Sequence, residues 1–240
     1  DCDRERLPAL QKRLSMYKLR ADVTLDDASE RILIVSCFGA DTDSAENGSD
    51  QVAGSTSSYG EGILYVDPRL AEMGVRIILP LEGAVETLEA SGFVRADTDA
   101  GDHRRLANGV PDAGRDVLIE KSMPLECNFG ELGAISYTKG CYVGQELTAR
   151  THHRGTLRKR LLPVRITGDV PASGTPIMHN DREVGIMRSG LGENGMALIR
   201  LEHLSSTDAA VQPVDVFDVD GASVQPWIPR WVEIKPLAGE

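Results

Sequence analysis

The sequence predicts an α+β protein that ends in a small β-barrel. Over residues 1–154, helix-like and strand-like segments follow one another, the arrangement typical of an α+β fold. Over residues 155–240, short β-like runs are spaced by Gly, Pro, Asn and Asp, the pattern typical of a small barrel or sandwich. With 240 residues and 41% apolar content, the chain can bury a substantial core.

The first elements are a helix and two strands. Leu7, Leu10, Leu14 and Tyr17 recur at steps of three and four, which predicts an amphipathic helix over residues 6–19 that packs on the core. Strands are expected over residues 21–25 and 31–37, the second rich in β-branched residues.

A polar insertion then interrupts the first region. Residues 40–61 are almost wholly Asp, Ser, Gly, Thr, Glu and Asn, so we expect a flexible loop. After it, the patterns predict strands at 63–66 and 75–79 and helices at 84–90 and 103–108.

The barrel region contains five strand-like runs. They cover residues 161–166, 175–178, 183–187, 196–201 and 214–219.

Composition excludes several classes of protein. A net charge of −11 argues against binding nucleic acid over the whole surface. No apolar run approaches the length of about 20 residues that spans a membrane, and no secretory signal begins the chain. The four cysteines show no C-x-x-C spacing, which favours a reducing compartment over a disulfide scaffold or a zinc site.

The segment around Cys141 concentrates reactive and conformationally special residues. Lys139 lies two positions earlier, so in an extended segment its ammonium would favour the Cys141 thiolate, the form that binds metals. Gly140 and Gly144 flank Cys141 and suggest a tight loop that displays it. The alternative is that Cys141 is a small buried apolar residue.

A short helix is expected directly after this loop. It runs from Gln145 to Arg150, with Glu146 in its first turn paired to Arg150 at i+4. Gln145 and Glu146 would hold the Cys141 loop in place, or simply cap the helix.

Other polar residues nearby are weaker candidates. Either His152 or His153 could add a nitrogen ligand to a metal on Cys141; in a strand only one would face it, and both could equally be exposed. Glu126 and Asn128 could line a cavity or bind loop backbone, and Cys127 is expected in the core.

One segment of this acidic chain is locally basic. No acidic residue lies between Leu147 and Thr167, so this run could bind an acidic partner or another polyanion, with RNA a minor option, or could form a solvated strand. Its members are Arg150, Arg154, Arg158, Lys159, Arg160 and Arg165.

The motif from Lys139 through Gly140, Cys141, Tyr142, Gly144 and Gln145 to Glu146 resembles the signature of the YgfZ-like proteins, relatives of the glycine cleavage T protein. Flanking stretches at 109–111, 124–128, 148–155, 158–160 and 227–231 extend the resemblance over most of residues 1–20 and 62–240. The run at 150–154 is most similar to the eukaryotic branch, the mitochondrial iron-sulfur cluster assembly factors.

This resemblance implies two ferredoxin-like α+β units, the first incomplete at the N-terminus, and a C-terminal β-barrel. It implies a factor that helps to form [4Fe-4S] clusters with an A-type scaffold protein. Cys141 would be a ligand of a transient cluster shared with that partner or with glutathione. The implied location is the mitochondrial matrix, with the chloroplast stroma as alternative, and a transit peptide would lie before this sequence.

Two rival functions come from other classes. One is a tetrahydrofolate-dependent aminomethyltransferase, or a folate-binding factor of tRNA modification, with Glu126 and Asn128 in the folate cavity. Against the transferase, the sequence has no counterpart of the T protein's Gly-Tyr-Thr-Gly-Glu stretch. The other rival is a catalytically silent module whose barrel docks a partner.

Overall fold

The computed structural model describes residues 2–39, 52–154, 157–208, 210 and 215–234. It divides the chain into two compact units. The first holds residues 1–67 and 74–95, and the second holds residues 68–73 and 96–240. Residues 96–154, which we grouped with the N-terminal region, thus belong to the same compact unit as the barrel.

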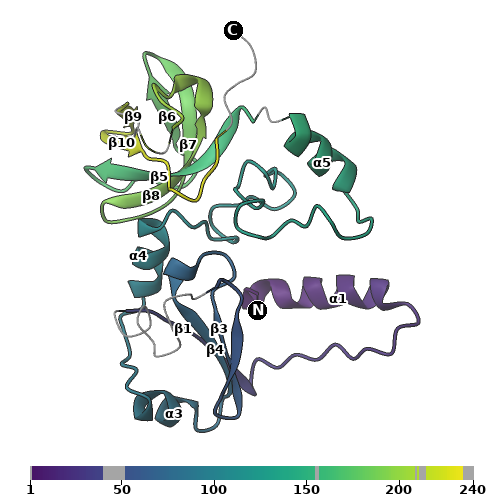
Figure 1. The fold of residues 1–240 in the computed structure, drawn as a ribbon. Helices are drawn as coiled ribbons and strands as arrows, with labels where there is room; N and C mark the ends of the chain where they lie inside the picture. Colours follow the sequence, from purple (N-terminus) through teal and green to yellow (C-terminus); the bar gives the residue numbers. More distant parts are fainter. Residues whose placement is uncertain (1, 40–51, 155–156, 209, 211–214, 235–240) are drawn as a thin grey trace. The chain divides into compact units, whose positions relative to one another are not determined.

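The first unit is built on a four-stranded antiparallel sheet of order β1-β4-β3-β2 (Figure 1). The strands are β1 (Ile32–Cys37), β2 (Thr56–Tyr59), β3 (Gly62–Val66) and β4 (Val75–Pro80), and helix α3 (Ala84–Ala90) follows. Along β4, Val75, Ile77 and Leu79 are buried and their neighbours are only partly buried. This alternation gives the sheet one core face.

Two expectations for the first unit are wrong. Residues 21–25 form no strand, and Thr56–Tyr59, which we placed in the flexible loop, is an edge strand paired with β3. Of the rest of the expected loop, residues 52–55 and 60–61 are described and contain turns but no strand, and residues 40–51 lie outside the described residues.

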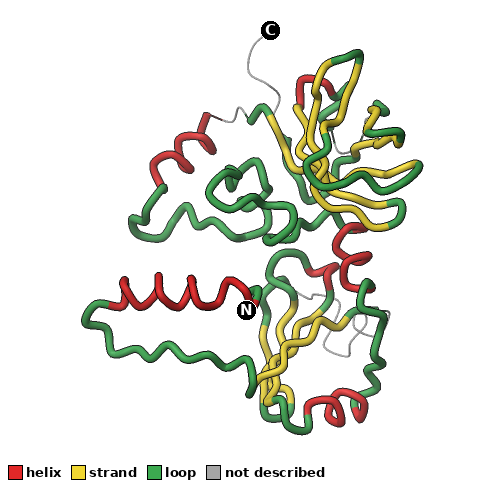
Figure 2. Tube along the Cα trace, turned by 180° about the vertical axis from the view of Figure 1, so that it is seen from behind, coloured by secondary structure: helices red, strands yellow, loops and turns green. Residues whose placement is uncertain are grey.

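Helix α1 (Leu7–Lys18) forms where the periodicity predicts it, after a 3-10 turn at Arg4–Arg6. It is not core structure, because none of its residues is buried and Tyr17 is 75% exposed. The helix and the returning segment, joined by a hydrogen bond from Gln11 to the Leu25 carbonyl, project from the sheet in both views (Figures 1 and 2).

The second unit is organised around a closed six-stranded barrel of order β10-β5-β8-β7-β6-β9. The strands are β5 (Lys159–Thr167), β6 (Pro176–His179), β7 (Arg182–Leu191), β8 (Asn194–Arg200), β9 (Phe217–Val219) and β10 (Ala222–Pro226). Its interior is filled by fully buried side chains such as Leu162, Met187 and Phe217. The predicted barrel is confirmed, with β10 as an additional strand.

Helices α4 (Ala100–Ala107) and α5 (Gln145–Arg154) belong to the second unit, as do 3-10 turns at Ala71–Met73 and Leu201–His203. Leu106 of α4 and Cys127 pack on Leu161 and Met196 of the barrel wall. Between residues 96 and 158 the described chain contains no strand. The α+β class is confirmed, but outside the barrel the described strands form a single open sheet where two ferredoxin-like units were expected. None of the described helices could cross a membrane.

Candidate functional site

The Cys141 segment bends through residues 137–140 and then enters α5. Gly144 has a φ of +84°, a conformation that a side chain disfavours. The amide of Gln145 donates to the Tyr142 carbonyl at 3.2 Å, and that of Thr148 donates to the Gly144 carbonyl at 3.1 Å. The helix expected after Gly144 therefore forms, and it continues to Arg154.

Gly140 does not have the role that its position suggests. Its φ is not positive, and a Cβ added there would meet no atom within 4 Å. Backbone geometry therefore requires a glycine at 144 but not at 140.

The Cys141 thiol is exposed, which excludes the alternative that it is a buried apolar residue. Cys127 is buried as predicted, and Cys37 is buried as well. Burial raises the pKa of Cys37 to about 11 and also raises the pKa of Cys127, so both remain protonated thiols at neutral pH. The other exposed cysteine is Cys2, in the first unit.

Lys139 contacts an aromatic ring. Its ammonium lies 4.8 Å from the centroid of the Tyr142 ring, a cation–π distance. The Tyr142 hydroxyl donates to the Ser136 carbonyl at 3.1 Å, and the Lys139 amide donates to Ser136 Oγ at 3.2 Å. These contacts fold the loop back on its own start, and activation of Cys141 by Lys139 stays a prediction.

The two histidines lie on a helix, not on a strand, because α5 extends through residues 151–154. The His152 ring stacks on Tyr137 with centroids 4.1 Å apart and an interplanar angle of 27°. His153 is the next residue of the helix. In the described part of the chain, no three His, Cys, Asp or Glu side chains come together as metal ligands.

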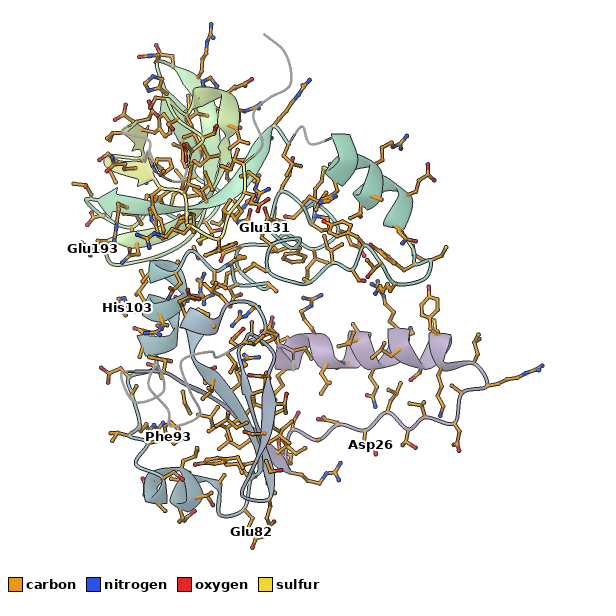
Figure 3. The ribbon with its side chains drawn as sticks, viewed as in Figure 1. Asp26, Glu82, Phe93, His103, Glu131 and Glu193 are labelled. Atoms are coloured by element: carbon orange, nitrogen blue, oxygen red, sulfur yellow. The ribbon has the colours of Figure 1, made fainter. Side chains whose placement is uncertain are left out.

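A cavity of about 290 Å³ lies beside the stacked rings. Its lining residues include Tyr137, Thr151, His152 and Arg160 of β5. Glu131, labelled in Figure 3, reaches toward the barrel and forms an ion pair with Arg160. Arg160 is only 4% exposed, so it is a buried structural cation and not part of an exposed anion-binding surface, which corrects the expectation for this residue.

The other basic candidates differ in exposure. Arg150 and Arg158 are exposed, and Lys159 is half-buried. Arg154 is the last residue of α5. Arg165 is exposed as well, but it donates to Asn194 and forms an ion pair with Glu193. Among the described side chains of the predicted patch, Arg150 and Arg158 are therefore more available to a partner than Arg165.

Glu126 and Asn128 bind the first barrel strand. The Leu161 amide donates to the Glu126 carbonyl at 2.8 Å, and Asn128 Nδ2 donates to the Leu161 carbonyl at 2.7 Å. Burial raises the pKa of the Glu126 carboxyl, although nearby Lys159 opposes the shift. Neither residue lines the cavity beside Tyr137, so a place for them in a folate cavity stays a prediction.

A buried ion network that the sequence did not reveal fixes α4 to the barrel. Arg105 donates to Asp116 Oδ2 and to Ser189 Oγ of β7, each at 2.8 Å, and it also pairs with Asp102. Burial alone would raise the pKa of Asp102, but the hydrogen bond from Arg115 and the charge of Arg105 together hold it below its usual value. No local spacing could have identified a network that joins residues so far apart in the chain.

Comparisons with known proteins agree with this architecture. Residues 158–234 match the family model described as "CAF17, C-terminal beta-barrel domain". In fold, the chain is similar to glycine cleavage system aminomethyltransferase T from Bartonella henselae, with a TM-score of 0.66 over 96% of this chain and 67% of that one. At 14% identity this likeness shows the fold alone.

Curated relatives are closer in sequence. The mouse protein named "Iron-sulfur cluster assembly factor IBA57, mitochondrial" is 37% identical over 210 residues, which cover 84% of this chain and 56% of that protein. The human protein of the same name is 36% identical over 230 residues, which cover 93% and 60%. The homologue from Aspergillus oryzae is 30% identical, with 85% and 53% covered.

The chain thus spans a little over half the length of the curated relatives that it matches. All three are named as mitochondrial, which supports the mitochondrial matrix over the chloroplast stroma as the location. The matched barrel, the T protein fold and these relatives agree with the Cys141 motif: the chain belongs to the YgfZ-like family of glycine cleavage T protein relatives, in the branch of the mitochondrial iron-sulfur cluster assembly factors.

Proposed function

We propose that this chain acts in iron-sulfur cluster assembly and that Cys141 supplies one ligand to a cluster shared with a partner protein. The observation that carries the proposal is the exposed thiol of Cys141, displayed on a loop that folds back on itself ahead of α5. The relatives named as assembly factors support the pathway. The cluster is cargo that passes through the site.

One thiolate cannot hold a cluster by itself. A [2Fe-2S] or [4Fe-4S] cluster normally takes four protein ligands. The described residues contain no group of three or more His, Cys, Asp or Glu side chains that could hold a metal. The remaining cluster ligands would therefore come from another molecule. An A-type scaffold that helps to form [4Fe-4S] clusters is our first candidate, and glutathione is the second.

The charge near the loop favours an acidic partner surface. Arg150 and Arg158 are exposed and lie in a run without acidic residues, while the whole chain carries a net charge of −11. Such a local reversal attracts an anionic patch and steers association. Cluster-bearing thiolates add negative charge to that patch, which these guanidinium groups would offset.

The test is reconstitution with an A-type scaffold, ferrous iron and sulfide. We expect the wild-type chain to form a coloured complex that elutes as one species. Cys141→Ser should form none, because a serine oxygen is a much harder ligand than the soft thiolate sulfur that these clusters take. Cys2→Ser is the matched control, since Cys2 is the other exposed thiol. A Cys141→Ser protein that still yields the same coloured complex refutes the proposal.

The folate-dependent alternative is tested separately. A transferase of the T protein type must bind tetrahydrofolate, so titration calorimetry with tetrahydrofolate and a methylene-transfer assay distinguish it from an assembly factor. Our proposal expects normal cluster transfer in the absence of folate.

A further inference from the structure

The segment that carries Cys141 is closed at its base by two aromatic rings. Tyr137 lies just before the loop, and His152 lies on the second turn of α5, yet their rings stack at 4.1 Å. We propose that Tyr137 and His152 are positioning residues for Cys141: the stacked pair clamps the two ends of residues 138–151 together and fixes where the thiol is presented. This inference rests on the proposed function for its consequence, not for its geometry.

Contacts inside the loop support the same closure. The hydroxyl of Tyr142, next to Cys141, reaches back to the Ser136 carbonyl, and the Lys139 amide reaches Ser136 Oγ. The first half of the loop is therefore fixed to the residue just before Tyr137. The ring stack then fixes the second half, through α5, to the same point.

The Tyr137 ring is itself held in place. A Cβ added at Gly130 would come within 2.9 Å of the Tyr137 hydroxyl oxygen, so the turn at residue 130 packs directly against that hydroxyl. Partial burial, followed by the nearby Glu131 carboxylate, raises the pKa of Tyr137, and the ring remains a neutral phenol at neutral pH. Glu131 in turn is paired with Arg160 of β5. The clamp is thereby anchored to the barrel.

This arrangement gives His152 a role other than that of a metal ligand. Its ring lies in the wall of the cavity with Tyr137, where it stacks on a neighbour. A loop of this length whose ends are not joined samples many conformations, and ordering it would reduce the affinity for a partner. A loop that is closed at its base is already ordered before the partner binds, so this cost does not reduce the affinity.

The direct test measures the mobility of the loop with a nitroxide spin label. In a Cys2→Ser background the label reacts at Cys141, because Cys37 and Cys127 are buried. We expect His152→Ala to narrow the spectrum, which reports faster motion, while His152→Phe keeps the wild-type line shape because the ring stack survives. Tyr137→Leu should match His152→Ala. Unchanged line shapes in both truncated variants overturn the inference.

A second measurement connects the clamp to function and separates the two proposals. With unlabelled protein, His152→Ala should slow complex formation with the scaffold by about two- to tenfold, the range of one aromatic pair, and His152→Phe should restore the rate. Since phenylalanine cannot bind metal, a His152→Phe protein as impaired as His152→Ala contradicts positioning. If Cys141→Ser still forms the complex, the proposed function is refuted, whereas the spin-label result on loop mobility remains valid. Should His152→Ala fold poorly, His152→Gln serves in its place.

Discussion

Replacing Asp116 with alanine is expected to lower the free energy of unfolding of the second unit by about 3–5 kcal/mol, the cost of removing one partner from a buried ion pair. Asp116 is 1% exposed, and its carboxylate accepts hydrogen bonds from Arg105, from the Asp112 amide at 2.7 Å and from the Ser189 amide at 3.1 Å. Alanine would leave the Arg105 guanidinium in the interior, with Asp102 as its remaining carboxylate partner among the described residues.

The measurement is denaturant unfolding followed by tryptophan fluorescence. Both tryptophans, Trp227 and Trp231, lie in the second unit, so the signal reports on that unit and not on the first. Asp169→Ala removes an exposed carboxylate and is the matched control, expected within about 0.5 kcal/mol of wild type. If Asp116→Ala lowers the free energy of unfolding by less than about 1 kcal/mol, water reaches the network and solvates the unpaired Arg105.

Removing Glu131 alone is expected to lower the free energy of unfolding by about 3 kcal/mol, because the buried Arg160 guanidinium then has no carboxylate partner among the described residues. Replacing both partners with apolar residues of similar size, Glu131→Leu with Arg160→Met, should recover most of that loss, since no buried charge is left behind. The same fluorescence measurement applies.

This double substitution also tests the reassignment of Arg160. If Arg160 is structural, the double variant should keep its affinity for the partner scaffold, whereas Arg158→Gln should weaken that affinity without affecting stability, because Arg158 is exposed. A double variant as unstable as Glu131→Ala would show that the ion pair itself stabilises the second unit, beyond preventing an unpaired buried charge.

Local patterns predicted the elements whose cause is local. Helix α3 has the expected bounds, and the barrel strands lie where alternating runs and turns placed them. Strand β10 was missed although Asp220 and Gly221, both with positive φ, form the two-residue turn that joins it to β9. Such an Asp-Gly pair is a strong hairpin signal, so this strand was predictable from the sequence.

Other features depend on contacts that no local window contains. Strand β2 is polar, and it forms because the edge of β3 offers it backbone hydrogen bonds. The helical period of residues 6–19 is real, but the period alone does not show which surface, if any, covers the apolar side chains. His152 and His153 were expected on a strand, because the basic run gave no sign that the helix continues to Arg154.

Within the candidate site, the sequence predicted the exposed cysteine but not its surroundings. The exposure of Cys141 and the turn at Gly144 were expected from the motif. The stack of Tyr137 on His152 and the pairing of Arg160 with Glu131 join segments that lie far apart along the chain. Only the folded unit brings them together.

The central claim is that another protein reaches Cys141 through a shared cluster. Alkylation with iodoacetamide followed by peptide mass spectrometry tests this directly, with and without the iron-loaded scaffold. We expect Cys141 and Cys2 to be labelled in the chain alone, and Cys141 to be protected while Cys2 is still labelled in the complex. If Cys141 is labelled at the same rate in the complex as in the chain alone, its sulfur is not a cluster ligand and the account is contradicted.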